Sequence, residues 1–419
     1  MNILILGGGG REHALAWAIS QNPKCDRLFC APGNAGIAEI AECVRINPED
    51  AAAVIAFAGE HAIDFVVIGP EAPLAAGVAD ELRNAGYLTF GPSKAAAQVE
   101  ASKAFTKELC DAANAPTAAY ARFTDAAPAK EYITEQGAPI VIKADGLAAG
   151  KGVTVAMDVD TALAAIDDCF SGAFGAAGAE VVIEEFMDGE EVSLFVLTDG
   201  TAMLSLASAQ DHKRAYDGDE GPNTGGMGAY SPAPVLTPEL LDQAMSQIVA
   251  PCLAELRDRG MPFAGVLYAG LMIQNGQARL VEYNARFGDP ECQLLMARMG
   301  AQALDLLLAV AEGTLADAQV AWADDHAVTV VLAAKGYPGD YAKGEAIHLP
   351  DLTGQPLVQI FHAGTADQDG QLVSNGGRVL GVTARGATLQ DARDLAYSVV
   401  DQVKWDGGFH RTDIGWRAL

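Results

Sequence analysis

The chain has 419 residues, half of them apolar, and carries a formal net charge of -28. That length exceeds what one hydrophobic core supports, so we expect a folded chain of three or four compact units. The acidic balance excludes nonspecific binding to nucleic acid or to an anionic membrane, which needs a basic face, and it requires any site for an anionic ligand to be locally basic.

The N-terminal segment alternates predicted strands and helices. A buried strand over residues 2–6 is followed by the glycine run Gly7–Gly10 and by an amphipathic helix from Arg11 to about Gln21. The further predicted elements are strands at 27–30, 65–68 and 88–90 and helices at about 49–60 and 72–84. Alternation of this kind predicts a parallel, doubly wound sheet.

The glycine run does not match a dinucleotide-binding site. With Gly7 and Gly9 in place, the third glycine position of that fingerprint is Glu12, and no acidic residue follows the second strand, where Ala31–Asn34 stands. We therefore expect the turn amides and the helix N-terminus to cradle one phosphate. Glycines that serve only a tight turn are an equally good interpretation of this segment taken by itself.

Beyond a seam at Gly91–Ser93, the pattern predicts a helix and three further units. The helix covers about 93–113, a small α/β unit covers about 122–190, a larger α/β unit covers 192–325, and short strands with one helix at about 388–403 follow from about 326. Within the small unit we expect strands at 139–143, 153–156 and 180–184 and a helix at about 160–170.

Cysteine usage and the N-terminal segment indicate the compartment. The seven Cys residues are scattered, without a CxxC pair or a Cys/His cluster, which predicts reduced thiols in a cytoplasmic protein. The first strand runs directly into the glycine turn without a basic start, so we expect no signal peptide. No apolar run reaches the length of a membrane span.

A glycine-rich hairpin is predicted between Lys143, at the end of an apolar strand, and the strand that starts at Val153. The loop Asp145–Gly152 holds three glycines and Lys151, and its backbone amides can fold over phosphates. It is not a Walker loop, because the spacing is short and no Ser or Thr follows the lysine. Taken alone, Lys143 is more simply a solvated lysine at a strand end.

Two acidic segments stand at strand ends. The strand ending at Glu184 leads into a hinge whose backbone can read the edge of adenine, and Glu191, seven residues later, can hold a ribose. Glu282 and Asn284 share one face of another strand, and their oxygens are ligands that Mg²⁺ takes. Arg286 follows on that face and can grip an anion. A ligand-free acidic turn and a half-buried strand with a solvated face are the plainer alternatives.

Together these elements resemble the ATP-grasp ligases, and within them the glycinamide ribonucleotide synthetase (phosphoribosylamine–glycine ligase) family over nearly the full length. The segments that carry the resemblance are Met1–Leu15, Ala31–Gly36, Gly69–Leu74, Ser102–Lys107, Ile142–Val153, Gln210–Arg214, Gly221–Pro232, Asn284–Glu291 and Arg411–Arg417. One such motif is weak, but nine in the same order are specific.

The resemblance implies an α/β multidomain fold. Its expected parts are a Rossmann-like N-terminal substrate domain (1–102), an ATP-grasp core (103–121 and 192–325), a small ATP-grasp lid (122–191) and a mostly-β C-terminal domain (326–419).

The resemblance also implies roles for single residues. Those expected to bind ATP are Lys103, Lys143, Lys151, Glu184, Glu185, Met187 and Glu191, with Lys107 as a rival to Lys103. Those expected in catalysis are Lys213, Arg286 and Asp289, and the expected metal ligands are Glu282 and Asn284. Those expected to bind the remaining substrate are Gly9, Arg11, Glu71, Asp211, Gly225 and Gly226, with a contribution from Gly376, Gly377 and Arg378.

The implied reaction joins glycine to 5-phosphoribosylamine with ATP, through glycyl phosphate, and releases ADP and phosphate, as a step of purine biosynthesis. It brings a carboxylate onto a polyanion, so Mg²⁺ or Mn²⁺, lysines and amides are needed where charge develops. A lid would keep water from the acyl phosphate. We expect a cytoplasmic monomer that binds neither nucleic acid nor membrane and contacts transiently the amidotransferase that supplies the labile amine.

Three other functions compete with this one. An ATP-grasp enzyme acting on bicarbonate or another carboxylate is disfavoured by the long Gly221–Pro232 block. A nicotinamide oxidoreductase is suggested only by the N-terminal glycines, and a catalytically inactive nucleotide-binding protein is disfavoured by the complete set of Lys, Glu and Asn residues.

Overall fold

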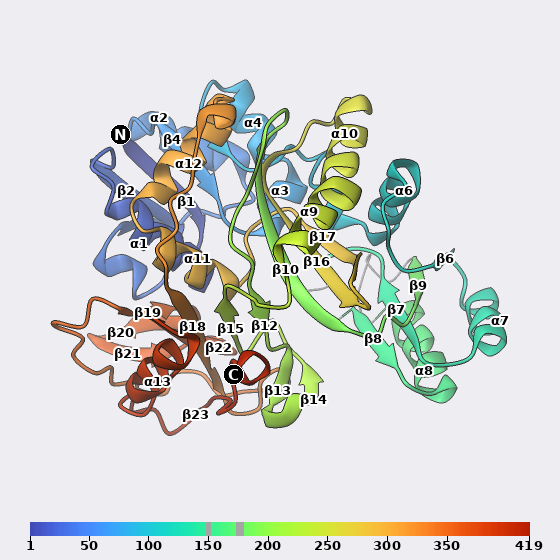
Figure 1. Cartoon of the computed structure of the whole chain (residues 1–419). Helices are drawn as coiled ribbons and strands as arrows, with labels where there is room; N and C mark the ends of the chain where they lie inside the picture. Colours follow the sequence, from blue (N-terminus) through green and yellow to red (C-terminus); the bar gives the residue numbers. More distant parts are fainter. Residues whose placement is uncertain (148–151, 173–179) are drawn as a thin grey trace.

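The computed structural model of the protein describes residues 1–147, 152–172 and 180–419. Four parts are visible (Figure 1): an N-terminal α/β part at the upper left, a small α/β part at the right, a central sheet between them and C-terminal strands at the lower left. This multidomain α/β architecture agrees with the fold class predicted from the sequence.

The N-terminal sheet has the order β3-β2-β1-β4-β5, and every neighbouring pair is parallel. Ile3 and Ile5 pack in one buried cluster, and Leu4 and Leu6 pack in another, because successive side chains of a strand point to opposite faces. Both faces are thus buried, which confirms the predicted doubly wound sheet. The elements are β1 (Asn2–Gly7), α1 (Gly10–Ser20), β2 (Arg27–Pro32), β3 (Glu42–Cys43), α2 (Ala51–Glu60), β4 (Phe65–Ile68) and β5 (Leu88–Phe90).

Two predicted helices are each divided in the structure. The helix expected over about 72–84 is α3 (Glu71–Ala76) and α4 (Val78–Asn84), because Gly77 takes φ +96°, a left-handed conformation that favours glycine. The helix expected over about 93–113 is α5 (Gln98–Ala101) and α6 (Lys103–Ala113). Ser102 is extended between them, and its Oγ accepts a hydrogen bond from Phe105 N at 3.1 Å, which caps α6.

The small sheet at the right, which we call the lid sheet, has the order β6-β9-β7-β8 and is antiparallel. Lys143 pairs with Val153, which confirms the predicted hairpin. The elements are β6 (Tyr120–Phe123), α7 (Ala126–Gln136), β7 (Ile140–Ala144), β8 (Val153–Ala156), α8 (Val159–Phe170) and β9 (Val181–Glu185). The two helices pack on this sheet around a buried cluster of their own, which makes it a separate small core.

The central sheet has the order β11-β10-β16-β17 and is also antiparallel. Its strands are β10 (Glu190–Asp199), β11 (Met203–Ser205), β16 (Ala264–Gln274) and β17 (Gln277–Asn284). The helices of this region are α9 (Pro238–Ala244), a π-helix (Met245–Val249), α10 (Ala250–Asp258), α11 (Glu291–Met299) and α12 (Gln302–Glu312). The segment from Glu282 to Asn284 is the last part of β17, so its prediction as a strand end is confirmed.

The C-terminal sheet has the order β12-β15-β18-β22-β19, and β23 also pairs with β18. Its strands are β12 (Gln210–Asp211), β15 (Gly228–Ser231), β18 (His326–Ala334), β19 (Val358–His362), β22 (Arg378–Gly386) and β23 (Gly408–Phe409). The remaining elements are the hairpins β13 (Arg214–Tyr216) with β14 (Glu220–Asn223) and β20 (Thr365–Gln368) with β21 (Gln371–Ser374), and the helix α13 (Leu389–Val400). Because β12 and β15 precede residue 326, this sheet draws on two distant stretches of the chain.

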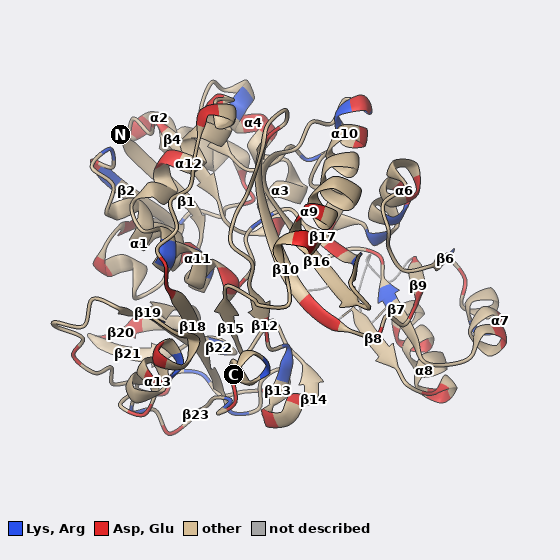
Figure 2. Cartoon of the chain, viewed as in Figure 1, with Lys and Arg blue, Asp and Glu red and all other residues tan. Residues whose placement is uncertain are grey.

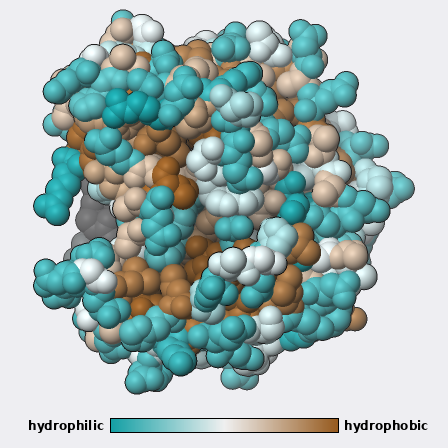
Figure 3. Space-filling model, turned by 90° about the vertical axis from the view of Figure 1, so that its left-hand side faces the viewer, coloured by the Kyte–Doolittle hydropathy of each residue, from teal (hydrophilic) through white to brown (hydrophobic). Residues whose placement is uncertain are grey.

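The surface agrees with an acidic protein. Asp and Glu are spread over most of the chain, whereas Lys and Arg are fewer and occur on α6 and β7 among other elements (Figure 2). Seen from the left-hand side of Figure 1, the surface is largely hydrophilic, with hydrophobic residues gathered across its lower half (Figure 3). In the described part of the chain, no single helix has both the length and the apolar character of a membrane span; only α11 and α12 taken together meet that test, and they are bent by 106°.

Candidate active site

A cleft of about 490 Å³ lies where the lid sheet, the central sheet, the N-terminal part and β22 meet. Its lining contains the residues that the sequence predicts for the site, except Gly9, Gly226, Gly376, Gly377 and Lys151. Lys151 lies outside the described residues, and Gly9 and Gly226 neighbour the cleft through Arg11 and Gly225. The fold therefore brings together segments that are distant in the sequence.

Glu184, on β9, is buried between two lysines. Its Oε1 lies 2.9 Å from Lys143 Nζ and its Oε2 lies 3.1 Å from Lys107 Nζ. Lys107 Nζ also donates to Thr117 Oγ1 at 2.8 Å and to the carbonyl of Ala118 at 3.2 Å, so all three of its N–H groups have partners. An ammonium group with three partners inside the chain is poorly placed to take a phosphate, which favours Lys103 over its rival Lys107.

Lys103 opens α6 and reaches the base of the glycine-rich loop. Its Nζ donates to the carbonyl of Gly146 at 2.9 Å. In the same loop, the Asp145 carboxylate accepts hydrogen bonds from Ser102 Oγ (3.0 Å) and from the amide of Ala104 (3.1 Å), so it stabilises the N-terminus of α6. Burial lowers the pKa of Lys103, although Glu282 acts in the opposite direction. The base of the loop is thus fixed on α6, with Lys103 beside it.

Glu282 and Asn284 lie on the same face of β17, and both line the cleft. Burial opposes the ionisation of Glu282, but Lys213, Lys143 and Lys103 together bring its pKa below the ordinary value. The carboxylate is therefore held in the form that binds a divalent cation. Among the described residues there is no group of three or more Asp, Glu, His or Cys side chains able to hold a metal. An ion at this pair of ligands would complete its shell with phosphate oxygens and water.

Lys213 and Glu191 form a close ion pair across the cleft. Burial disfavours the charge of Lys213, yet Glu191 and Asp211 raise its pKa well above the ordinary value. Burial raises the pKa of Asp211 to about 7, with further contributions from nearby carboxylates. Glu191, which the sequence analysis expected at the ribose, thus already has a cationic partner within the chain.

Arg286 is held between two carboxylates. Its Nη2 lies 2.6 Å from Glu100 Oε1, and its Nε donates to Glu71 Oε2 at 3.3 Å. Glu100 also accepts the amide of Ala285 at 2.7 Å. Arg11 Nη1 approaches Glu71 at 3.8 Å. The predicted residues Arg11, Glu71 and Arg286 therefore form one chain of alternating charge along the cleft.

The N-terminus of α1 is occupied by carboxylates of the chain itself. The amide of Gly9 donates to Glu12 Oε2 at 2.6 Å, and the amide of Arg11 donates to Asp289 Oδ2 at 3.2 Å. A Cβ on Gly69 would lie 2.2 Å from Glu12 Oε1, so this glycine makes room for the buried glutamate. Two side-chain carboxylates thus stand at the helix N-terminus, and binding of a phosphate by these amides stays a prediction that requires at least one carboxylate to move.

Asp289 joins the N-terminal part to β22. Its Oδ1 accepts a hydrogen bond from Gln293 Nε2 at 3.0 Å and lies 3.5 Å from Arg378 Nη2. Burial opposes its ionisation, but Arg378 and Arg11 lower the pKa of Asp289. Arg378 Nη1 also donates to the carbonyl of Gly225 at 2.6 Å. The C-terminal region thus reaches the cleft through one arginine.

Several polar residues that line the cleft were not predicted from the sequence, among them Glu100, Tyr268 and Glu291. Tyr268 OH donates to Glu291 Oε1 at 3.0 Å and lies 2.8 Å from Ser193 Oγ, so these groups form a buried hydrogen-bonded cluster. Glu291 closes the Asn284–Glu291 motif and could have been found there. Glu100 and Tyr268 stand alone in helical and strand patterns, with no local signal of a role.

Known sequence families match the chain in order along its length. The domains described as "Phosphoribosylglycinamide synthetase" are the N domain over residues 1–100, the ATP-grasp (A) domain over 101–292 and the C domain over 327–417. A protein of Agrobacterium fabrum named phosphoribosylamine–glycine ligase is 60% identical over 420 residues, which are 100% of this chain and 99% of that protein. A protein of Arabidopsis thaliana with the same name, described as chloroplastic, is 55% identical over 98% of this chain and 79% of its own length.

Solved structures show the same fold. The crystal structure of phosphoribosylamine–glycine ligase from Thermotoga maritima has a TM-score of 0.88 and 32% identity, and the match covers 99% of this chain and 100% of that one. The biotin carboxylase domain of a Hydrogenobacter thermophilus 2-oxoglutarate carboxylase, solved with MgADP and bicarbonate, has a TM-score of 0.76 at 15% identity over 98% of this chain and 91% of that one. At that identity the second likeness concerns the fold alone.

Proposed function

This chain belongs to the phosphoribosylglycinamide synthetase family, and we infer that it ligates glycine to 5-phosphoribosylamine at the expense of ATP. The products are glycinamide ribonucleotide, ADP and phosphate, and the reaction is a step of purine biosynthesis. The full-length identity to proteins named for this reaction supports the assignment, as does the ATP-grasp fold.

One observation carries the chemical part of the proposal. Lys103, Lys143 and Lys213 stand close enough to Glu282 that together they lower its pKa in spite of its burial. Cations and a metal-binding carboxylate at one point are what the transfer of a phosphoryl group between two anions requires. A locally basic cleft of this kind lets a chain with a formal net charge of -28 bind anionic ligands.

The residue roles in the first half-reaction are part of this proposal. Lys103 and Lys143 hold the α- and β-phosphates, and Lys213 balances the charge that develops on the transferred γ-phosphoryl group. The adenine lies against Glu184, Glu185 and Met187, at the end of β9. Glu282 and Asn284 would hold a divalent metal ion, as ATP-grasp enzymes use, and the ion would supply positive charge against the phosphates. The role of Lys151 near the phosphates is proposed from the resemblance alone, because this residue lies outside the described ones.

Arg286 orients the glycine carboxylate toward the γ-phosphorus, so that glycyl phosphate forms and ADP remains as the leaving group. Asp289 holds the adjoining wall of the cleft. The lid sheet and the glycine-rich loop keep water from the acyl phosphate.

The second half-reaction takes place at the N-terminal side of the cleft. Arg11 and Glu71, with Gly9, Gly225 and Gly226, hold phosphoribosylamine so that its neutral amine attacks the acyl carbon and phosphate leaves. Asp211 is part of this site and, with a pKa of about 7, exchanges a proton near neutral pH.

We further propose that the metal is Mg²⁺ or Mn²⁺, that the enzyme is a cytoplasmic monomer, and that it contacts transiently the amidotransferase that makes the labile amine. All seven Cys residues are free thiols, in agreement with a reducing compartment.

The test is an assay of ADP release with ATP and Mg²⁺ in which glycine and phosphoribosylamine are each omitted in turn. We expect full turnover only with both, and none when bicarbonate replaces glycine. Turnover with bicarbonate but not with glycine would assign the chain to a carboxylase instead. The stoichiometry of one ADP per glycinamide ribonucleotide, followed by mass spectrometry, distinguishes ligation from idle ATP hydrolysis.

A further inference from the structure

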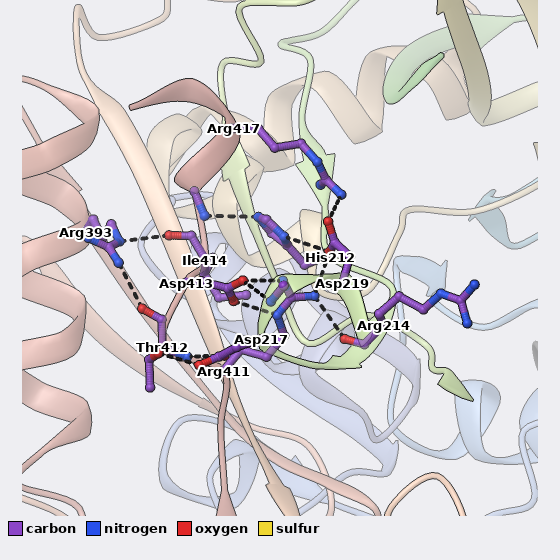
Figure 4. Close-up of polar contacts among 12 residues, drawn as sticks. His212, Arg214, Asp217, Asp219, Arg393, Arg411, Thr412, Asp413, Ile414 and Arg417 are labelled. Carbon is purple, nitrogen blue, oxygen red and sulfur yellow. Dashed lines mark hydrogen bonds and ion pairs between the residues drawn. The ribbon is translucent and has the colours of Figure 1, made fainter. Parts of the chain in front are cut away.

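The C-terminal segment Arg411–Arg417 packs against the hairpin of β13 and β14 (Figure 4). Arg411 is fully buried and forms a two-point contact with Asp413, from Nε at 2.7 Å and from Nη2 at 2.8 Å. Its Nη1 donates to Asp219 Oδ1 at 2.9 Å, and Arg417 forms a close ion pair with the other oxygen of Asp219. A buried arginine is costly unless it is fully paired, so this arrangement holds the segment and the hairpin in one fixed relation.

The same segment contacts the residues on both sides of Lys213. On one side, the amide of Gly415 donates to Nε2 of the buried His212 at 3.0 Å. On the other side, Arg411 Nη1 donates to the carbonyl of Arg214 at 3.1 Å. The residues before and after Lys213 are therefore both fixed by the C-terminal segment (Figure 4).

The C-terminal segment is itself anchored on a rigid helix. Arg393, on α13, donates from Nε to the carbonyl of Ile414 and from Nη2 to the carbonyl of Thr412, both at 2.9 Å. Tyr397, one turn further along α13, donates from its hydroxyl to the carbonyl of Arg411 at 2.7 Å. Since α13 packs on β18 and β22, the anchor reaches into the C-terminal sheet.

The segment does not form part of the cleft. The described lining of the cleft includes Asp211 and Lys213 but no residue from 411 to 417. Lys213 points into the cleft, where it pairs with Glu191. The contacts of the segment are thus made behind Lys213, and the side chain itself is left for the ligand.

We propose that Arg411–Arg417 is a positioning element for Lys213: it fixes the His212 side chain before this lysine and the Arg214 main chain after it, and so holds the ammonium group at the triphosphate end of the cleft. The proposal rests on the proposed function, because the role of Lys213 in phosphoryl transfer is part of it. Arg411 is the central positioning residue, and it acts only through the hairpin.

The kinetic test compares Arg411→Met, Arg411→Lys, Lys213→Ala and the double variant Arg411→Met/Lys213→Ala. A misplacement of about 1 Å at a reacting group can cost about 100-fold in rate, so we expect Arg411→Met to lower kcat between about 10- and 100-fold. The KM for glycine should stay within about twofold, because Arg286, its proposed partner, is held by Glu71 and Glu100 and not by the hairpin. Arg411→Lys should recover part of the rate.

The double variant is decisive. If Arg411 acts through Lys213, the kcat of the double variant should be no lower than that of Lys213→Ala alone. A kcat lowered by the product of the two single losses would overturn the proposal. The control is Arg385→Met, which removes a partly buried arginine of β22 that pairs with Asp325 at 3.2 Å and does not touch the hairpin. It should leave kcat unchanged. An equal loss in this control would show a general effect of lost ion pairs and would overturn the proposal.

Two further measurements keep the test interpretable. If circular dichroism shows that Arg411→Met does not fold, Arg417→Gln replaces it in the same comparison with Lys213→Ala. That substitution removes only the outer partner of Asp219. Hydrogen exchange of the amides of residues 212–216, measured without substrates, should be faster in either variant than in the wild type; unchanged exchange would refute the proposal. Because exchange needs no turnover, it separates a failure of this inference from a failure of the proposed reaction, which the wild-type assay alone decides.

Discussion

Replacing Glu184 by glutamine removes the charge that two buried lysines share. The side chains of Glu184, Lys107 and Lys143 are exposed by 3%, 3% and 5%, and the two ion pairs are 3.1 and 2.9 Å long. With an effective dielectric constant of about 20, each pair at this distance attracts with about 5 kcal/mol. Repulsion between the two ammonium groups and the cost of taking three charges out of water offset most of that sum. Loss of one partner from a buried pair typically costs about 3–5 kcal/mol, and we expect Glu184→Gln to lower the free energy of unfolding by that amount.

The neighbouring residue supplies the control. Glu185 pairs with Arg279, but these side chains are exposed by 43% and 32%, so Glu185→Gln should cost only about 0–1 kcal/mol. The assay is urea denaturation followed by circular dichroism, with and without MgADP. Since we propose that Lys143 binds phosphate, MgADP should stabilise Glu184→Gln more than it stabilises the wild type. Equal losses in the two variants would refute the argument from burial, and equal stabilisation by MgADP would refute the phosphate contact of Lys143.

Three further results are expected from the same cleft. Glu282→Ala should abolish turnover by weakening metal binding, and a near-normal rate at saturating Mg²⁺ would contradict that role. Arg286→Ala should damage the glycine half-reaction while ATP still binds, as equilibrium dialysis can show; loss of nucleotide binding would mean that the role is misplaced. Glu191→Gln should raise the KM for ATP. It should also move the alkaline limb of the kcat–pH profile to lower pH, because Glu191 raises the pKa of Lys213. An unshifted limb would mean that ionisation of Lys213 does not control the rate.

Local patterns predicted most strands of the N-terminal sheet and of the lid sheet, but not β3, β6 or the helix α7. The strand at Phe65–Ile68 and the hairpin that follows Lys143 are set by short-range periodicity and glycine content, and both are found as predicted. The breaks at Gly77 and Ser102 were missed, because a helix-compatible sequence continues through both. A single glycine or serine is tolerated within many helices, so only the packing of the finished fold decides whether it ends one.

Among the polar residues of the cleft, too, those set by a local pattern could be predicted and those set by tertiary packing could not. Glu282 and Asn284 could be placed on one face because alternation along a strand is a local rule. Glu100 could not be found, since an isolated acid in a helical pattern is usually solvated. Its burial depends on Arg286, which is 186 positions away along the chain and 2.6 Å away in space. Contacts of this kind arise from tertiary packing, to which one sequence read by itself gives no guide.

The C-terminal sheet is built from two distant stretches of the chain, which limits how this enzyme can be recombined with its relatives. Strands β12 and β15 pair into the sheet built on β18 and β22, although they lie about a hundred residues earlier in the chain. A chimera joined at residue 326 would therefore ask β15 of one parent to pair with β18 of another along four residue pairs. Exchanging residues 210–231 together with residues 326–419 would keep the β15–β18 pairing within a single parent. We expect such chimeras to fold more often than those joined at residue 326 alone.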